Sequence, residues 1–255
     1  MKTEKAPLSI VIIAKNEEKA IAECLESVSW AGEVIVVDDQ SADRTIEIAK
    51  AHGARVVQKK MEVEGKHRND AYALAAHEWV LSLDADEQVS SELKEEIMKM
   101  LSDGTPYAGF SIPLRNYIGN RWVRHGGWYP AAKLRLFRKN RFRYEEVEVH
   151  PRAFLDGKEG NLRGDIIHKG SPDFAHFLES LNRQTSLEAE KRFHEKRKSG
   201  LFLCFYKALD RFMRAFILKQ GFRDGFLGFM VAYYAALYQM MSYAKYWELK
   251  ERKNR

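Results

Sequence analysis

Residues 33–58, EVIVVDDQSADRTIEIAKAHGARVVQ, decide the fold. The stretch opens with an apolar run, passes through a polar turn into a helical repeat, and returns to an apolar run at Ala54–Gln58. Ser41 or Asp43 is available as the N-cap of the helix, and Gly53 follows its end. A strand, a helix of this length and a second strand form the unit from which parallel sheets are built.

The same alternation continues on both sides of this stretch. Leu8–Ala14, Glu33–Asp38 and Trp79–Asp84 are apolar runs, and helical segments separate them. We therefore expect a mostly parallel, doubly wound sheet as far as about Met100.

Beyond that point the pattern changes twice. Between Tyr107 and Lys169 the helical period disappears, and short β-like runs predict a mixed extension of the sheet. These runs are Gly109–Pro113, Leu134–Phe137, Glu146–His150 and Ile166–His168. From Pro172 onward the expected elements are three helices, Phe174–Ser199, Phe202–Lys219 and Gly225–Glu251. We predict an α/β fold with a catalytic domain at residues 1–170 and a helical C-terminal region at 171–255.

Composition and motifs disfavour several classes of protein. With 255 residues, 45% of them hydrophobic, the chain can bury a core. Cys24 and Cys204 have no CxxC partner, which argues against a zinc site and fits a reducing compartment. The run at Leu8–Ala14 is short for a secretory signal, so a buried strand explains it better. The sequence contains neither the GxGxxG nor the P-loop pattern, which disfavours dinucleotide oxidoreductases and P-loop enzymes.

Carboxylates follow two of the predicted strands. Asp38 ends the second strand, and Asp84 and Asp86 follow the fourth. Ligands of open α/β sheets bind at the carboxyl ends of the strands. An Asp-x-Asp pair in a tight turn can offer oxygen ligands to Mg²⁺ or Mn²⁺, which would neutralise charge on a departing diphosphate. Turn formation and helix capping are the structural alternatives for either cluster alone.

Neighbouring residues are expected to hold a nucleotide. Asp38 would accept hydrogen bonds from a nucleobase or ribose. The residues beside it at the end of the first strand are Ala14, Asn16 and Glu17. Lys66 and Arg68, at the start of the third helix, would contact the phosphates of this nucleotide. The structural alternative is that both are basic residues of the first helical turn that lie in solvent.

Three segments, SIVIIAKNEE (9–18), VVDDQSADRT (36–45) and LDADE (83–87), resemble family 2 inverting glycosyltransferases in order and spacing. GKHRN (65–69), GGWYP (126–130) and LRLF (134–137) further resemble the bacterial branch that adds hexoses to the lipopolysaccharide core.

The resemblance implies a GT-A fold, a UDP-sugar or similar donor, and one inverting displacement. In its terms Asp38 contacts the base and Arg68 the nucleotide. Asp84 belongs to the ribose or the metal shell, and Asp86 to the metal. The acceptor would be a glycan or lipid-linked molecule of the bacterial cell envelope.

The sequence leaves open which residue acts as the general base. Relatives of this branch often have Val-His-Glu where this chain has Val149-His150-Pro151. Period-2 alternation would place Glu146, Glu148 and His150 on one strand face, and either a carboxylate or a neutral imidazole can deprotonate a hydroxyl. Glu148 and His150 are the leading candidates, and an exposed acidic strand face is the structural alternative.

Aromatic residues suggest an acceptor platform. Trp128 and Tyr129 follow two glycines that permit close backbone approach, so they would stack on an acceptor sugar. Core packing explains the same residues equally well.

The C-terminal region suggests a membrane surface. Lys191–Arg223 holds ten Lys and Arg against two acidic residues, and Gly225–Ala244 carries no charge. We expect peripheral attachment to anionic lipid at the cytoplasmic face first, a helical homo-oligomer interface second and a membrane span third. Nucleic-acid binding comes last because no recognition motif is present.

Two other functions remain open at this point. A sugar nucleotidyltransferase would also use a parallel sheet, carboxylates and a metal. A membrane-bound scaffold that has lost turnover would explain Pro151, although the retained aspartates weigh against it.

Overall fold

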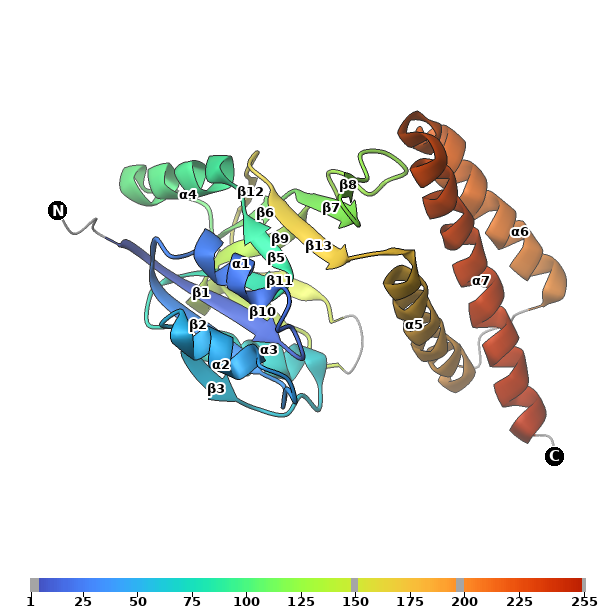
Figure 1. The fold of residues 1–255 in the computed structure, drawn as a ribbon, viewed down its shortest axis with the longest axis horizontal. Helices are drawn as coiled ribbons and strands as arrows, with labels where there is room; N and C mark the ends of the chain where they lie inside the picture. The colour runs from blue at the N-terminus through green and yellow to red at the C-terminus, as the bar shows by residue number, and fades with distance from the viewer. Residues whose placement is uncertain (1–4, 148–150, 196–199, 254–255) are drawn as a thin grey trace. The chain divides into compact units, whose positions relative to one another are not determined.

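The computed structural model describes residues 5–147, 151–195 and 200–253. Figure 1 traces the chain. Two compact units are present. The first consists of Met1–Leu114 and Ala132–Lys169, and the second of Arg115–Ala131 and Gly170–Arg255.

The first unit is built on a seven-stranded sheet with the order β12-β6-β9-β4-β1-β2-β3. Its parallel half confirms the four expected strands. They are β1 (Ala6–Ala14), β2 (Ala31–Asp38), β3 (Arg55–Gln58) and β4 (Trp79–Asp84). β1 pairs in parallel with both β2 and β4, so the ends of these three strands lie at one edge of the sheet.

The mixed extension is also confirmed. β9 (Lys133–Arg138) runs antiparallel to both β4 and β6 (Gly109–Ile112), and β12 (Glu159–Asn161) pairs in parallel with β6. Separately, β5 (Glu87–Val89) pairs antiparallel with β13 (Ile166–Ser171).

Helices cover both faces of this sheet. α1 (Ile21–Ser27), α2 (Thr45–Ala51) and α4 (Ser91–Asp103) contribute to a core with one face of β1 and β4. α3 (Glu64–Ala73) contributes to a second core on the other face. Burial on both faces explains why the strands are nearly continuous apolar runs.

The start of α2 differs from the expectation. Arg44 occupies the N-cap position, so neither Ser41 nor Asp43 is the N-cap. The Asp43 carboxylate instead accepts hydrogen bonds from the Thr45 N–H and, across the loops, from the Glu18 N–H. Gly53 follows the helix end with φ +78°, as expected of a residue in the left-handed region.

The expected strand at Glu146–His150 is wrong over its described part. β10 (Phe142–Tyr144) pairs with β11 (Ala153–Leu155), and residues 145–147 between them are not in a strand. The Val147 N–H donates to the Glu145 carbonyl at 3.0 Å, which closes a tight turn instead of extending the ladder. Glu148 and His150 lie outside the described residues.

The second unit combines a hairpin with three long helices. β7 (Leu114–Ile118) pairs antiparallel with β8 (Arg121–Trp122). α7 (Gly225–Lys253) packs against both α5 (Phe174–His194) and α6 (Leu201–Met213). A π-helical turn at Arg214–Leu218 and a 3-10 turn at Gly221–Asp224 connect α6 to α7.

Gly228, Ala232 and Gln239 of α7 are buried. A Cβ on Gly228 would lie 1.8 Å from the Gly221 carbonyl oxygen, so this glycine lets the 3-10 turn pack closely against α7. Among the described helices, none combines the length and apolar character needed to cross a bilayer. Cys24 and Cys204 are buried free thiols, one in each unit.

Candidate active site

The first part of the site is a pair of arginines on Asp84, at the end of β4. Arg68 Nη2, from α3, lies 3.1 Å from Asp84 Oδ1, and Arg135 Nη2, from β9, lies 2.8 Å from Asp84 Oδ2. Burial alone would raise the pKa of Asp84, but the charges of Arg135 and Arg68 outweigh it and hold the pKa well below its ordinary value. Asp84 therefore stays ionised.

Glu87, the first residue of β5, completes this cluster. It is buried, its Oε1 lies 2.7 Å from Arg135 Nη2, and its Oε2 accepts the Asp84 backbone N–H at 2.8 Å. Burial raises the pKa of Glu87, while the charge of Arg135 opposes that rise. Arg135 is 3% exposed, so its charge depends on these two carboxylates for compensation.

Asp86 points to a different partner. Its Oδ2 lies 3.2 Å from His168 Nε2, and His168 belongs to β13 of the same unit. Burial would lower the pKa of His168, but the hydrogen bond and charge of Asp86 outweigh it and raise the pKa. The Asp86 and His168 side chains are 21% and 32% exposed, so both remain accessible to a ligand.

Glu17, in the loop that follows β1, lies in the electrostatic field of this acidic group. Burial raises its pKa to about 7, and the negative charges of Asp86, Asp43 and Asp84 add to the effect. Negative charge at this edge of the sheet is thus only partly compensated in the folded chain.

Hydrogen bonds connect the loop that follows β1 with the loop that follows β2. Asn16 has φ +55° and its side-chain oxygen accepts the Ala42 N–H at 2.8 Å. The Glu17 N–H donates to Thr45 Oγ1 at 2.8 Å, and the Asp39 N–H donates to the Ala14 carbonyl at 2.8 Å. Asn16 and Ala14 thus shape the loops that surround Asp38.

Asp38 itself is fully buried. Its Oδ2 accepts the Ser41 N–H at 3.0 Å, whereas its Oδ1 has no hydrogen-bond partner among the described residues. A buried carboxylate oxygen without a donor is costly, and a ligand N–H or O–H would satisfy it. Because the side chain is covered, such a ligand could reach it only after the surrounding loops part.

The remaining predicted residues lie elsewhere. Lys66 is 57% exposed and faces Asp70 at 3.5 Å, in contrast to Arg68 in the cluster. Glu146 is exposed. Trp128 and Tyr129 belong to the second unit, where Trp128 packs against a small core and Tyr129 contacts the Trp122 ring edge-on at 5.1 Å.

Arg135, Glu87 and His168 were not among the site residues predicted from the sequence. A signal for Arg135 was present, because a charged residue interrupts the apolar run Leu134–Phe137 and needs a buried partner.

Within the described ranges, no three acidic, histidine or cysteine side chains already converge as a metal-binding group. Asp86 and His168 nevertheless offer one carboxylate oxygen and one imidazole nitrogen side by side. Carboxylate oxygen and neutral imidazole both ligate Mn²⁺, whereas Mg²⁺ prefers oxygen, so a cation here would displace the proton between Asp86 Oδ2 and His168 Nε2 and take further oxygens from a diphosphate. The residues present therefore fit a metal held jointly with a ligand.

Charged groups at the carboxyl ends of the parallel strands lie where open α/β enzymes bind their ligands. Residues 9–155 match the sequence profile described as "Glycosyl transferase family 2". The chain belongs to this family and is a glycosyltransferase, and its mixed, mostly parallel sheet is the GT-A architecture that the resemblance implied.

Relatives of similar length agree. An "Uncharacterized glycosyltransferase RT0209" of Rickettsia typhi is 30% identical over 95% of this chain and 87% of its own length. The "Lipopolysaccharide core biosynthesis glycosyltransferase LpsC" of Rhizobium meliloti is 24% identical over 98% of this chain and 96% of its own length.

Solved structures of other proteins align with this chain in part or almost in full. S. aureus TarS residues 1–349 in complex with UDP aligns over 99% of this chain and 92% of that chain, with TM-score 0.48 and 17% identity. Glucosyl-3-phosphoglycerate synthase from Mycobacterium tuberculosis, crystallised with Mn²⁺ and UDP, aligns over 45% of each chain with TM-score 0.37 and 23% identity.

Proposed function

We propose that this glycosyltransferase transfers a hexose from a UDP-sugar to a glycan or lipid-linked acceptor with inversion at the anomeric carbon. The observation that carries the proposal is the group of Asp84, Asp86, Arg68 and His168 at the carboxyl end of β4. Cationic and anionic side chains alternate there within a few ångströms, which suits a diphosphate and its counter-ion.

The chain's own residues divide the work of binding the donor. Asp38 Oδ1 accepts a hydrogen bond from the nucleobase, because it is a buried oxygen at the end of β2 that lacks a donor among the described residues. Arg68 is held by Asp84 at 3.1 Å and Glu64 at 3.3 Å, so its guanidinium is oriented before the donor arrives. Asp84 accepts from the ribose while its charge stays compensated.

Asp86 and His168 would hold the divalent cation. When bound, that cation supplies positive charge to the leaving diphosphate. Arg68 adds a second positive charge from the protein side. A single displacement then needs one base for the acceptor hydroxyl, and Glu148, His150 and Glu146 are the proposed carriers.

The proposed setting is synthesis of the bacterial cell envelope. The relative named for lipopolysaccharide core biosynthesis supports this setting, since it covers almost the whole chain. Trp128 and Tyr129 are the proposed acceptor contacts. We place the enzyme at the cytoplasmic face of the membrane, bound peripherally, with a homo-oligomer through the C-terminal helices as the other arrangement.

Thermal stability with nucleotide sugars tests the donor site. A ligand present at about 100 times its Kd stabilises the folded state by about 2.7 kcal/mol. We expect UDP-sugars to raise the melting temperature with Mn²⁺ and to lose most of that effect with a chelator. Asp86→Ala should remove the Mn²⁺-dependent part, whereas Asp103→Ala, an exposed residue of the same unit, should keep it.

Product analysis tests the reaction. The proton NMR coupling of the new glycosidic bond should show an inverted anomeric configuration. Donor binding without transfer to any envelope acceptor would instead support a scaffold, and formation of a sugar nucleotide from sugar phosphate and UTP would support a nucleotidyltransferase.

A further inference from the structure

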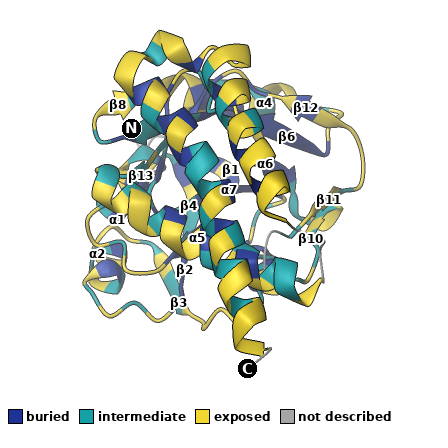
Figure 2. Ribbon diagram, turned by 90° about the vertical axis from the view of Figure 1, so that its right-hand side faces the viewer, coloured by how far each residue is buried: buried dark blue, intermediate teal, exposed yellow. Residues whose placement is uncertain are grey.

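The outer side of α6 carries large apolar residues that the second unit leaves uncovered. Cys204 and Ala208 make up its buried stripe. The apolar residues that face outward are Leu201 at 60% exposure, Phe202 at 86%, Phe205 at 54%, Tyr206 at 61%, Leu209 at 63% and Met213 at 45%. Figure 2 shows the exposed residues along α6. This amphipathic pattern differs from that of a helix buried in a bundle.

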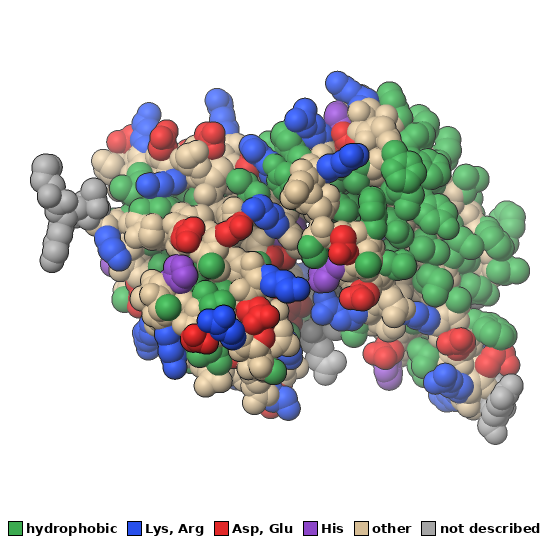
Figure 3. Space-filling model, viewed as in Figure 1, with side chains coloured by type: hydrophobic (Ala, Val, Ile, Leu, Met, Phe, Trp, Pro, Cys, Tyr) green, Lys and Arg blue, Asp and Glu red, His purple; other side chains and the backbone are tan. Residues whose placement is uncertain are grey.

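The apolar surface continues from α6 onto α7. Phe212 and Phe229 lie 5.9 Å apart between ring centres, and Phe216 contacts both Phe222 and Phe229. Phe222 and Phe226 are 51% and 69% exposed. Figure 3 shows one broad hydrophobic area over α6 and α7. A contiguous exposed apolar patch of this kind marks an interaction surface.

A basic pocket borders the N-terminal end of α7. A cavity of about 440 Å³ is lined by Arg121, Trp122, Arg124, His125, Arg223, Asp224 and Leu227. Its one carboxylate, Asp224, is already bound by His125 Nδ1 at 2.6 Å and by two backbone N–H groups. The three arginines of the lining therefore dominate its charge.

The arginines of this pocket are partly oriented. Arg124 lies over the Trp122 ring at 4.6 Å, and Arg223 Nη1 donates to Gln220 Oε1 at 2.8 Å. No acidic partner is found for Arg121, Arg124 or Arg223 within residues 5–147, 151–195 and 200–253. Guanidinium groups in this arrangement favour a phosphate ester.

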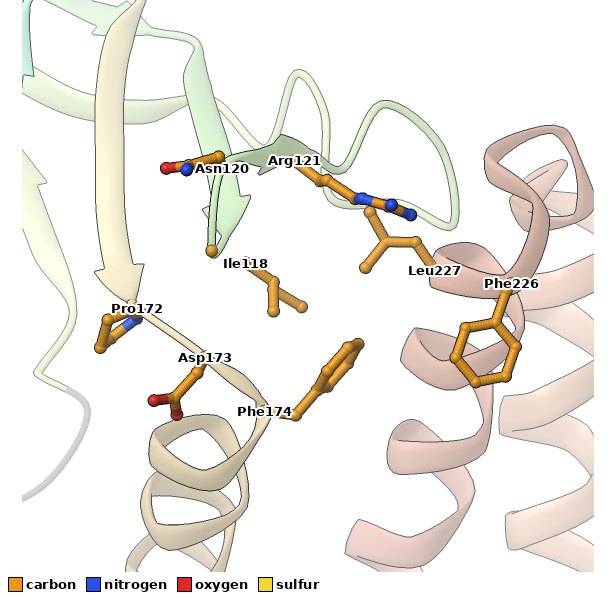
Figure 4. A pocket seen from close by; sticks show the side chains of 9 residues that line it. Ile118, Asn120, Arg121, Pro172, Asp173, Phe174, Phe226 and Leu227 are labelled. Atoms are coloured by element: carbon orange, nitrogen blue, oxygen red, sulfur yellow. The ribbon is translucent and has the colours of Figure 1, made fainter.

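A mostly apolar cavity adjoins the basic one. It measures about 300 Å³ and shares Arg121 and Leu227 with it. Figure 4 shows Phe174 and Phe226 on its walls and the Arg121 side chain extending from β8 toward Leu227. An apolar pocket beside a cationic one fits an amphiphile with an anionic head.

We propose that the outer face of α6 and the adjoining part of α7 insert into the headgroup region of an anionic bilayer, and that Arg121, Arg124 and Arg223 bind the phosphate of one of its lipids. This inference deepens the membrane location proposed above by assigning the surface and the lipid chemistry. It does not depend on which sugar is transferred.

Charge favours a lipid surface over a second copy of the chain. Residues 201–223 contain five basic side chains and one acidic one, Asp210, which pairs with Arg214 at 2.8 Å. In a two-fold dimer the same patch would meet itself and bring these positive charges together. Anionic headgroups attract each of them instead, and exposed aromatic residues suit the interface.

Vesicle co-sedimentation of the full chain tests the proposal. We expect binding to phosphatidylcholine vesicles that contain phosphatidylglycerol, and weak binding to phosphatidylcholine alone. Arg121→Gln, Arg124→Gln and Arg223→Gln together should weaken binding, by about fivefold for each charge removed. Phe202→Glu with Leu209→Glu should weaken it by at least about tenfold. The matched control neutralises Lys94, Lys99 and Arg163, which are exposed basic residues of the first unit, and should bind as the wild type does.

Other outcomes would overturn the inference. Equal binding by all variants would remove the assigned surface. A concentration-dependent dimer that Leu209→Glu dissociates, without vesicle binding, would assign the face to a second copy. Stabilisation by inorganic phosphate that the arginine variant loses, again without vesicle binding, would assign the pocket to a soluble phosphate. Thermal shifts with UDP-sugar in the same variants report on the donor site separately, so the two proposals fail independently.

Discussion

At the scale of single residues, Arg135 connects the site to the stability of the first unit. It is 3% exposed, and its Nη2 forms ion pairs with both Asp84 and Glu87. Removing one partner of a buried ion pair typically costs about 3–5 kcal/mol, because a charge is left uncompensated. We expect Arg135→Met to lower the free energy of unfolding by this amount in urea titrations.

Two variants make this expectation specific. Arg141→Met removes an exposed partner of Asp156 and should cost less than about 1 kcal/mol. Adding Glu87→Met to Arg135→Met should recover part of the loss, since the buried carboxylate disappears with its counter-ion. A loss in Arg135→Met no larger than in Arg141→Met would contradict the role assigned to the cluster.

Glu17 gives the site a pH dependence whose sign can be stated. Its folded-state pKa of about 7 exceeds the ordinary value of 4.5, so the folded chain holds this proton more tightly than the unfolded chain. The stability of the wild type should therefore fall as the pH rises from about 4.5 to about 7. Glu17→Gln should be more stable than the wild type at pH 8, by about 1–2 kcal/mol because Glu17 is partly exposed and screened, and equal to it near pH 4.

Denaturant titrations across that pH range measure the effect. Glu95→Gln, on the exposed side of α4, is the matched control and should track the wild type. A stability difference for Glu17→Gln that stays constant with pH would mean that the carboxylate is not in the field of its acidic neighbours.

The residue scale also shows what sequence alone can locate. Asp38, Asp84 and Asp86 could be chosen as candidates because the end of a buried strand is a local signal. The partners were harder to find, since Arg135 and Asp84 are 51 residues apart and meet only through the pairing of β9 with β4. The side-chain contact of His168 with Asp86 likewise depends on the pairing of β13 with β5.

At the scale of elements, α3 depends on a glycine for its position. A Cβ on Gly65, in the first turn of this helix, would lie 1.8 Å from the Glu145 carbonyl oxygen. Within a helix, replacing glycine by alanine ordinarily gains about 0.5–1 kcal/mol. Here we expect Gly65→Ala to destabilise the chain by about 1–3 kcal/mol, because backbone must move to admit the methyl group.

Thermal unfolding checks this reversal of sign. Gly200→Ala is the control, because nothing lies within 4 Å of the added Cβ; since Gly200 is the N-cap of α6, the loss expected there is at most about 1 kcal/mol. Since α3 carries Arg68, Gly65→Ala should also weaken UDP-sugar binding. A stabilised Gly65→Ala variant with normal donor binding would show that residues 145–147 yield easily.

Elements with local signals were predicted well, and those defined by distant partners were not. β4 begins and ends at the expected residues because an apolar run is bounded by polar turns. Residues 115–131 were expected in the catalytic domain, and they form part of the second unit. Their side chains pack with Leu227 and Val231 of α7, a contact that no local period reveals.

At the scale of the whole molecule, the division into two compact units predicts which peptides exchange hydrogen more slowly when the donor binds. The proposed donor contacts lie at the ends of β1, β2 and β4 in the first unit, whereas the helices α5–α7 belong to the second. Ligand binding stabilises the structure that binds it, and local opening there becomes rarer. Hydrogen exchange with UDP and Mn²⁺ should therefore slow in peptides that cover residues 14–18, 38–45 and 84–87. Peptides from residues 201–223 should exchange as they do without ligand and should slow only with anionic vesicles.

The Asp86→Ala variant is the control. It should lose the Mn²⁺-dependent protection at the strand ends and keep the vesicle-dependent protection of residues 201–223, because the Asp86 carboxylate binds the proposed metal and not the lipid. Protection of residues 201–223 by UDP alone would contradict this separation, since the nucleotide would then act on the surface assigned to the membrane.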